Sequence, residues 1–250
     1  MPQDVSFYLL AIPAVILVGL AKGGFSGMGA LGMPLLALAI DPVRAAAILL
    51  PILIAQDVVG VAAFRKSWDG RILAIMLPGA ALGVVLGWWF AASVSSRAVM
   101  VAVGAIAMLF GLYRLWVERG GRIAAPSDSP AFVGTLFGIV TGFTSQVAHA
   151  GGPPFQMWVM PRRLGRDVLI GTTAIFFAVL NWIKVPAYVA LGQFTADNAM
   201  TTLVLLPFAL LGSFAGVRLV RRIAMERFYT IVYALMVVAG GKLLWDGLGL

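Results

Sequence analysis

Two lysines lie inside long apolar stretches, where a charged side chain is costly and therefore a candidate for function. Lys22 is the one charged residue within 7–40, and Lys184 lies in the apolar run 168–191, one helical turn after Asn181. Hydroxyl, amide and imidazole groups accompany the lysines near two glycine-rich stretches. Cationic side chains and hydrogen-bond donors together are suited to binding an anion.

The candidate substrate-binding residues lie in or beside these glycine-rich stretches or within the run that contains Lys184. Glycine permits turns and close approach of the backbone. A helix that restarts after such a turn presents free N–H groups and a positive dipole end to an anion. Pro34 and Pro153 suit the first turn of a restarting helix. The candidates are Lys22, Gly23, Ser26, Gly27, Thr144, Ser145, Gln146, His149, Gly151, Gly152, Asn181 and Lys184.

The composition predicts a polytopic α-helical membrane protein. The 250-residue chain is 61% hydrophobic and 11% charged, whereas soluble domains are about half apolar and about one quarter charged. The net charge of +8 comes from basic residues in short loops and not from one patch, so no nucleic-acid partner is expected. With no cysteine and one histidine, the chain lacks the ligand set of a zinc or iron–sulfur site, and no metal or cofactor is expected.

The apolar residues form eight runs, and two of them exceed the roughly 20 residues that a simple transmembrane helix needs. These two, 7–40 and 131–160, contain the glycine-rich breaks, and a shift of 119 positions places Gly19 on Gly138 and Pro34 on Pro153. The matching predicts two copies of one unit. The expected division is a first repeat 1–117, a cytoplasmic linker 118–130 and a second repeat 131–250, with the other runs at 45–64, 72–92, 98–117, 168–191, 199–217 and 228–248.

The basic residues predict the orientation, because cytoplasmic loops are enriched in Lys and Arg. Run 131–160 then enters and leaves on the cytoplasmic side, and run 7–40 on the outer side, so each is a helical hairpin or a re-entrant pair of short helices. Three simple crossings follow each hairpin, so the second repeat is inverted and both termini lie outside the cytoplasm. Thirteen of the eighteen basic residues are assigned to the cytoplasmic side: Arg65, Lys66, Arg71, Arg114, Arg119, Arg122, Arg162, Arg163, Arg166, Arg218, Arg221, Arg222 and Arg227.

Two stretches resemble the TauE/SafE family of sulfite and organosulfonate exporters, and the resemblance covers essentially the whole chain. They are TSQVAHAGGPP at 144–154 and NWIKVPAYVALGQ at 181–193. The first break departs from the family's three consecutive glycines, since 27–34 reads GMGALGMP. The resemblance implies a transporter of small sulfur-containing anions, and the compact, cysteine-free chain suits a bacterial inner membrane.

The sequence therefore predicts a secondary transporter, not an enzyme, that exports sulfite or a sulfonate and has this oxyanion and the lipid bilayer as its partners. The alternatives are an anion channel of the same fold, a transporter of small carboxylates and, remotely, an intramembrane hydrolase using Ser145 and His149, which lie four residues apart. Proton coupling through His149 is a further possibility. Some of these residues also have a purely structural explanation. The glycines could serve tight helix packing, and Asp57 could form an ion pair with Arg65 or Lys66.

Overall fold

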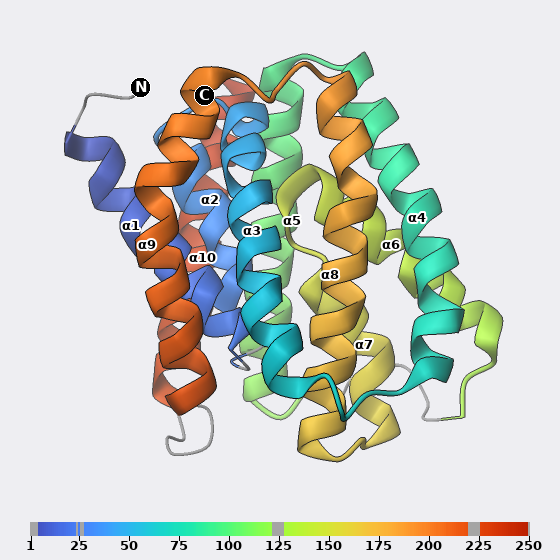
Figure 1. Ribbon diagram of the computed structural model, residues 1–250. Helices are drawn as coiled ribbons and strands as arrows, with labels where there is room; N and C mark the ends of the chain where they lie inside the picture. The colour runs from blue at the N-terminus through green and yellow to red at the C-terminus, as the bar shows by residue number, and fades with distance from the viewer. Residues whose placement is uncertain (1–4, 24, 26–27, 122–127, 220–225, 250) are drawn as a thin grey trace.

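The computed structural model describes residues 5–23, 25, 28–121, 128–219 and 226–249, which form a bundle of helices (Figure 1). Every regular element within these residues is helical and none is a strand, which confirms the predicted all-α class. The elements are α1 (Val5–Lys22), η1 (Met28–Leu31), α2 (Gly32–Ala37), α3 (Pro42–Phe64), α4 (Gly70–Ser93), α5 (Ser96–Glu118), α6 (Ala131–Ala148), α7 (Gly152–Val159), η2 (Met160–Arg162), α8 (Arg166–Ala190), α9 (Ala196–Leu219) and α10 (Glu226–Leu248).

Seven of the described helices are long and apolar enough to cross a membrane, namely α3, α4, α5, α6, α8, α9 and most of α10. Large apolar side chains such as Leu82, Trp89 and Leu211 are at least half exposed on the outside of the bundle. In water such a surface would be unfavourable, whereas lipid tails solvate it. The predicted polytopic membrane protein is therefore confirmed.

Polar residues at the turns fix where the long helices begin. The Asp41 side chain accepts hydrogen bonds from the backbone N–H groups of Val43 and Arg44 at 2.9 and 3.1 Å, which caps α3. Asp69 caps α4 in the same way, and the Ser95 hydroxyl caps α5. These short side chains satisfy N–H groups that have no partner inside the helix. Five helices also contain an internal proline: Pro13, Pro51, Pro78, Pro186 and Pro207.

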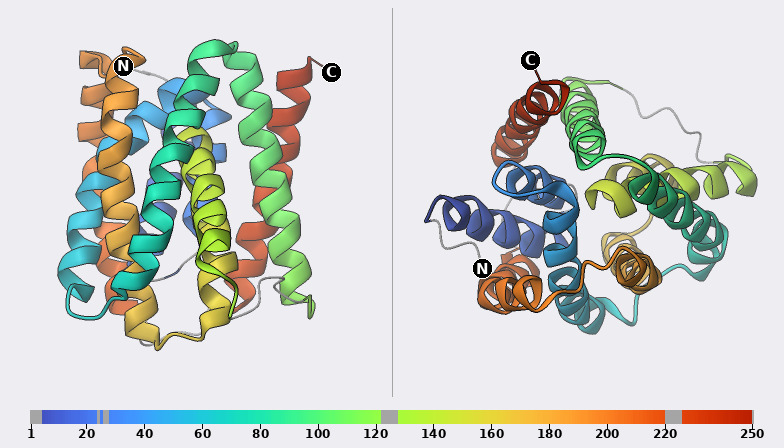
Figure 2. Two further views of the ribbon diagram at one scale, coloured as in Figure 1. Left: turned by 90° about the vertical axis from the view of Figure 1, so that its right-hand side faces the viewer. Right: turned by 90° about the horizontal axis from the view of Figure 1, so that it is seen from above.

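Each of the two long apolar runs turns back inside the bundle. The start of α6 and the end of α7 lie at the same end as the 65–69 turn, which is the lower end in Figure 1. The start of α1, the end of α10 and the connection 38–41 lie at the opposite end, as the side view in Figure 2 also shows. The α1–α2 and α6–α7 segments thus each return to the end from which they start.

Glycines let helix backbones touch at several crossings, among them α1 on α9, α6 on α4 and α5 on α10. A Cβ atom on Gly19 would lie 2.5 Å from the carbonyl oxygen of Ala209, and one on Gly138 would lie 2.4 Å from that of Met76. Small residues at such contacts allow the close approach on which helix association in membranes depends. The packing interpretation of these two glycines is therefore correct, and the pair matched by sequence shift performs the same task in each half.

Candidate functional site

The second glycine-rich break places the end of one helix and the start of another inside the bundle. α6 ends at Ala148, and the next residue, His149, has a left-handed φ of 49° and donates its N–H to the Ser145 carbonyl at 3.1 Å. α7 begins at Gly152, and Pro153 occupies its first turn, as the sequence predicts. Ser145 is 2% exposed, so this broken backbone is lined by protein.

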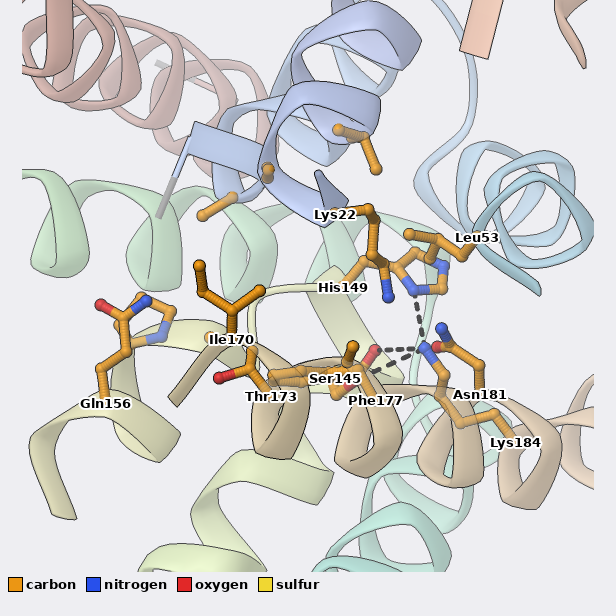
Figure 3. Close-up of a pocket in the computed structure, with 17 residues that line it drawn as sticks. Lys22, Leu53, Ser145, His149, Gln156, Ile170, Thr173, Phe177, Asn181 and Lys184 are labelled. Atoms are coloured by element: carbon orange, nitrogen blue, oxygen red, sulfur yellow. Dashed lines mark hydrogen bonds between the residues drawn. The ribbon is translucent and has the colours of Figure 1, made fainter. Parts of the chain in front are cut away.

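Lys184 of α8 reaches this break from the side and is completely buried. Its Nζ lies 2.8 Å from His149 Nδ1, 3.3 Å from Ser145 Oγ and 3.4 Å from the Ser145 carbonyl oxygen (Figure 3). His149 Nε2 lies 2.9 Å from the Ala46 carbonyl oxygen, which can only accept a hydrogen bond. Nε2 therefore carries the proton, Nδ1 accepts from Lys184, and the imidazole is neutral.

A second cationic group, Lys22 at the end of α1, forms an ion pair across the bundle. Its Nζ lies 2.5 Å from Asp57 Oδ1 on α3, and Asn181 Nδ2 on α8 donates to Asp57 Oδ2 at 2.6 Å. The expected pairing of Asp57 with Arg65 or Lys66 is wrong. Asp57 is 4% exposed and faces the interior, and those basic residues lie more than two helical turns further along the same chain.

The two lysines line one cavity of about 100 Å³ between α1, η1, α3, α6, α7 and α8. Figure 3 shows Lys22 approaching it from one side, while Lys184, Asn181 and Ser145 lie on another. Lys184 donates to a hydroxyl, a carbonyl and an imidazole, so the hydrogen-bond partners described for it carry no negative charge. The lining comprises Val18, Ala21, Lys22, Gly29, Ala30, Leu53, Ser145, His149, Gly152, Pro153, Gln156, Ile170, Thr173, Ala174, Phe177, Asn181 and Lys184.

Other predicted site residues lie away from this cavity lining. A Cβ atom on Gly23 would lie 2.5 Å from the Gly216 backbone, so Gly23 belongs to the α1–α9 crossing. The Thr144 hydroxyl donates to the Val140 carbonyl at 2.8 Å within α6. Gly151 lies against the Thr141 carbonyl. Gln146 is 2% exposed, and its backbone carbonyl accepts a hydrogen bond from the Tyr188 hydroxyl at 2.9 Å. Ser26 and Gly27 lie outside the described residues.

Several lining residues are missing from the sequence-based set, among them Thr173 and Phe177. Lys22 Nζ lies 5.4 Å from the centre of the Phe177 ring, within the range of a cation–π contact. Thr173, Phe177, Asn181 and Lys184 follow one another at spacings of four, four and three along α8. This spacing places them on one helix face and is the signal that would identify the first two.

The hydrolase alternative requires His149 to take a proton from Ser145. Both ring nitrogens of His149 are engaged elsewhere, one by Lys184 and the other by the Ala46 carbonyl. The Ser145 hydroxyl instead lies beside the Lys184 ammonium group. The geometry thus favours Ser145 as a polar ligand over Ser145 as a nucleophile.

Ser145→Ala is expected to weaken anion binding modestly. The variant removes one Lys184 contact and keeps the contact to the carbonyl of residue 145, and a hydrogen bond of this kind contributes about 0.5–1.5 kcal/mol. The half-saturating anion concentration should rise about two- to tenfold with maximal flux nearly unchanged. Ser213→Ala, which removes a buried hydroxyl bound to Ala209 within α9, is the matched control. Complete loss of activity in the Ser145 variant alone would instead support a nucleophilic serine.

The sequence matches one family model, described as sulfite exporter TauE/SafE, over residues 11–243. The match therefore includes both glycine-rich breaks and every residue that lines the cavity. No match to the chain was found among the curated proteins or among the solved structures.

Proposed function

Because the chain belongs to the sulfite exporter TauE/SafE family, we propose that it exports a small sulfur-containing anion, such as sulfite or a sulfonate, by binding it in the cavity between the two broken segments. The observation that carries this proposal is Lys184, a completely buried lysine whose described hydrogen-bond partners are all neutral. Burying a charge without a counter-ion is expensive. A transported anion that binds beside Lys184 would act as the missing counter-ion.

The cavity suits an anion of a few atoms. Its volume of about 100 Å³ exceeds the roughly 10–15 Å³ that a single water molecule needs, so a small oxyanion can be accommodated. Lys184 and Ser145 supply donors at one side, and Lys22 supplies a second ammonium group. Charge-assisted hydrogen bonds to oxyanions are about twice as strong as neutral ones. A trigonal or tetrahedral oxyanion therefore matches both the size and the donor set.

The position of the cavity along α8 supports loading from the end of the bundle that carries the basic segments 65–71 and 162–166, here called the basic end. α8 begins at that end, and its first turns contribute Ile170, Thr173 and Phe177 to the lining, whereas Lys184 lies further along. Lys22 retains 15% side-chain exposure while Lys184 has none. Beyond Lys184, Tyr188 is 2% exposed and stacks on His149 at 6.1 Å. An anion would enter at the basic end, and Tyr188 would block its passage beyond Lys184.

We assign the basic end to the cytoplasm of a bacterial cell, which places both termini outside. The 65–71 and 162–166 segments carry Arg and Lys residues and lie at that end, and basic loops favour the cytoplasmic side. The two halves are then inverted repeats, with α1–α2 entering from outside and α6–α7 from inside. The equivalent crossings, α1 on α9 and α6 on α4, support this arrangement. Inverted repeats with broken helices meeting at the substrate are the architecture of many secondary transporters.

Sulfite efflux from proteoliposomes is expected to follow the membrane potential. An inside-negative potential expels each negative charge with about 2.3 kcal/mol per 100 mV, so an anion uniporter needs no coupling ion. Purified protein would be reconstituted with internal sulfite and a potassium-diffusion potential of either sign, with protein-free liposomes as the control.

The outcomes separate the alternatives. Saturable efflux that reverses with the potential supports the carrier, whereas efflux that rises linearly with concentration supports a channel. Efflux that appears only with a pH gradient indicates proton coupling. Transport of small carboxylates but not of sulfite or sulfonates would overturn the assigned substrate.

A further inference from the structure

We propose that Asp57 determines the charge of the anion that the site accepts, so that monoanions are selected over dianions of the same shape. The inference rests on the proposed transport function and adds a specificity-determining residue to it. Asp57 is outside the predicted site and does not line the cavity. It acts through Lys22, whose charge it offsets.

The geometry holds the Asp57 carboxylate in one place. Lys22 Nζ occupies one oxygen at 2.5 Å and Asn181 Nδ2 occupies the other at 2.6 Å. The carboxylate is 4% exposed, so water does little to screen it. Lys22 and Asn181 are both cavity-lining residues. The Asp57 carboxylate is therefore a fixed negative charge in contact with two residues that an anion in the cavity would touch.

The charges around the cavity can be counted. Lys22 and Lys184 are the ionisable cationic groups of the described lining, and His149 is neutral in this hydrogen-bond arrangement. With both lysines protonated around a bound anion, two ammonium groups and the Asp57 carboxylate leave one positive charge. A monoanion, such as a sulfonate or hydrogensulfite (the singly protonated form of sulfite), brings the buried site to neutrality. A dianion leaves one negative charge in excess, and an uncompensated buried charge is strongly unfavourable.

Methanesulfonate and sulfate are suitable probes for this rule. Both are tetrahedral around sulfur and have the same number of heavy atoms, but a methyl group replaces one oxygen and removes one charge. Their relative flux therefore reports the charge preference with size held constant. The proteoliposome assay used for sulfite measures the flux of each anion when it is loaded separately.

Asp57→Asn is expected to raise the sulfate-to-methanesulfonate ratio at least about tenfold. The variant keeps the side-chain shape and removes the negative charge, and unit charges interact more strongly in a partly buried site than in bulk water. Asp57→Glu keeps the charge and should retain the wild-type preference. An unchanged ratio in Asp57→Asn, with sulfite still carried, would overturn the charge rule and leave the transport proposal intact.

A charge-balanced double variant covers the case in which Asp57→Asn does not fold. Lys22→Gln combined with Asp57→Asn removes the ion pair and restores one net positive charge, so its ratio should equal that of the wild type even if total flux falls. Lys22→Gln alone removes the positive charge and should favour the monoanion further. A ratio in the double variant shifted towards sulfate would mean that the ion pair, not the charge count, sets the preference. Absence of flux for sulfite and both probes in the wild type would remove both proposals.

Discussion

Lys184→Met is expected to reduce anion flux at least about 100-fold while the protein remains folded. Lys184 Nζ lies at the inner end of the cavity, where its partners are Ser145 and His149. Removing one member of a buried charge pair costs about 3–5 kcal/mol, and each 1.4 kcal/mol is a factor of about ten in affinity. Radioactive anion uptake in proteoliposomes, with the amount of inserted protein measured in parallel, checks the result.

The same substitution should leave stability unchanged or raise it. Lys184 is completely buried, and replacing an unpaired buried charge by an apolar side chain of similar length removes a desolvation penalty. Lys242→Met is the matched control, because Lys242 is exposed and pairs with Asp246 one turn away on α10. Flux within about twofold of wild type in the Lys184 variant would exclude Lys184 from the site. Loss of folded protein would make it a structural residue.

Gly142→Ala is expected to abolish most folded protein. A Cβ atom at this position would lie 2.0 Å from the Ala80 carbonyl oxygen on α4, and backbone atoms cannot move aside as a flexible side chain can. The two helices must therefore separate, and over-packing of this kind costs about 1–3 kcal/mol or more. Ser145 lies one turn further along α6, so the surviving protein should also lose affinity for the anion. Thermal unfolding monitored by size-exclusion chromatography measures the loss.

Gly241→Ala on α10 is the control for this substitution. A Cβ atom there would have no neighbour within 4 Å, so the change should be neutral or stabilise the helix by about 0.5–1 kcal/mol. Equal tolerance of the two substitutions would show that α4 and α6 do not cross as closely as described. A large loss in the Gly142 variant alone supports the crossing.

The positions of the helices and of the second break are predictable from sequence because their causes are local. Apolar length defines the spans, and Gly152 followed by Pro153 starts α7 at the predicted place. Lys184 also stands out from sequence alone, since an ionisable residue inside a span is unusual. These features need no knowledge of which helices are neighbours.

The partners of these residues are not predictable in the same way, because they depend on which faces of distant helices meet. Asp57 joins Lys22 from α1 and Asn181 from α8, and nothing near Asp57 in the sequence indicates either contact. Gly23 is a predicted site residue but lies at a helix crossing. Glycine permits close approach of the backbone in both settings, so the residue type alone does not distinguish them. The contact of Gly23 with Gly216 is visible only once α1 and α9 are placed together.

The helices differ in how readily they bend, because only some of them contain an internal proline. α1, α3, α4, α8 and α9 each contain one, and a helix that already lacks a backbone hydrogen bond at a proline bends there with little further loss. α5 and α10 contain none over their described lengths and pack against each other. α6 also contains none, so the long described helices comprise three stiff ones, α5, α6 and α10, and five compliant ones that each contain a proline. Both lysines of the cavity belong to compliant helices, so flexing of α1 and α8 changes the distance between the two positive charges.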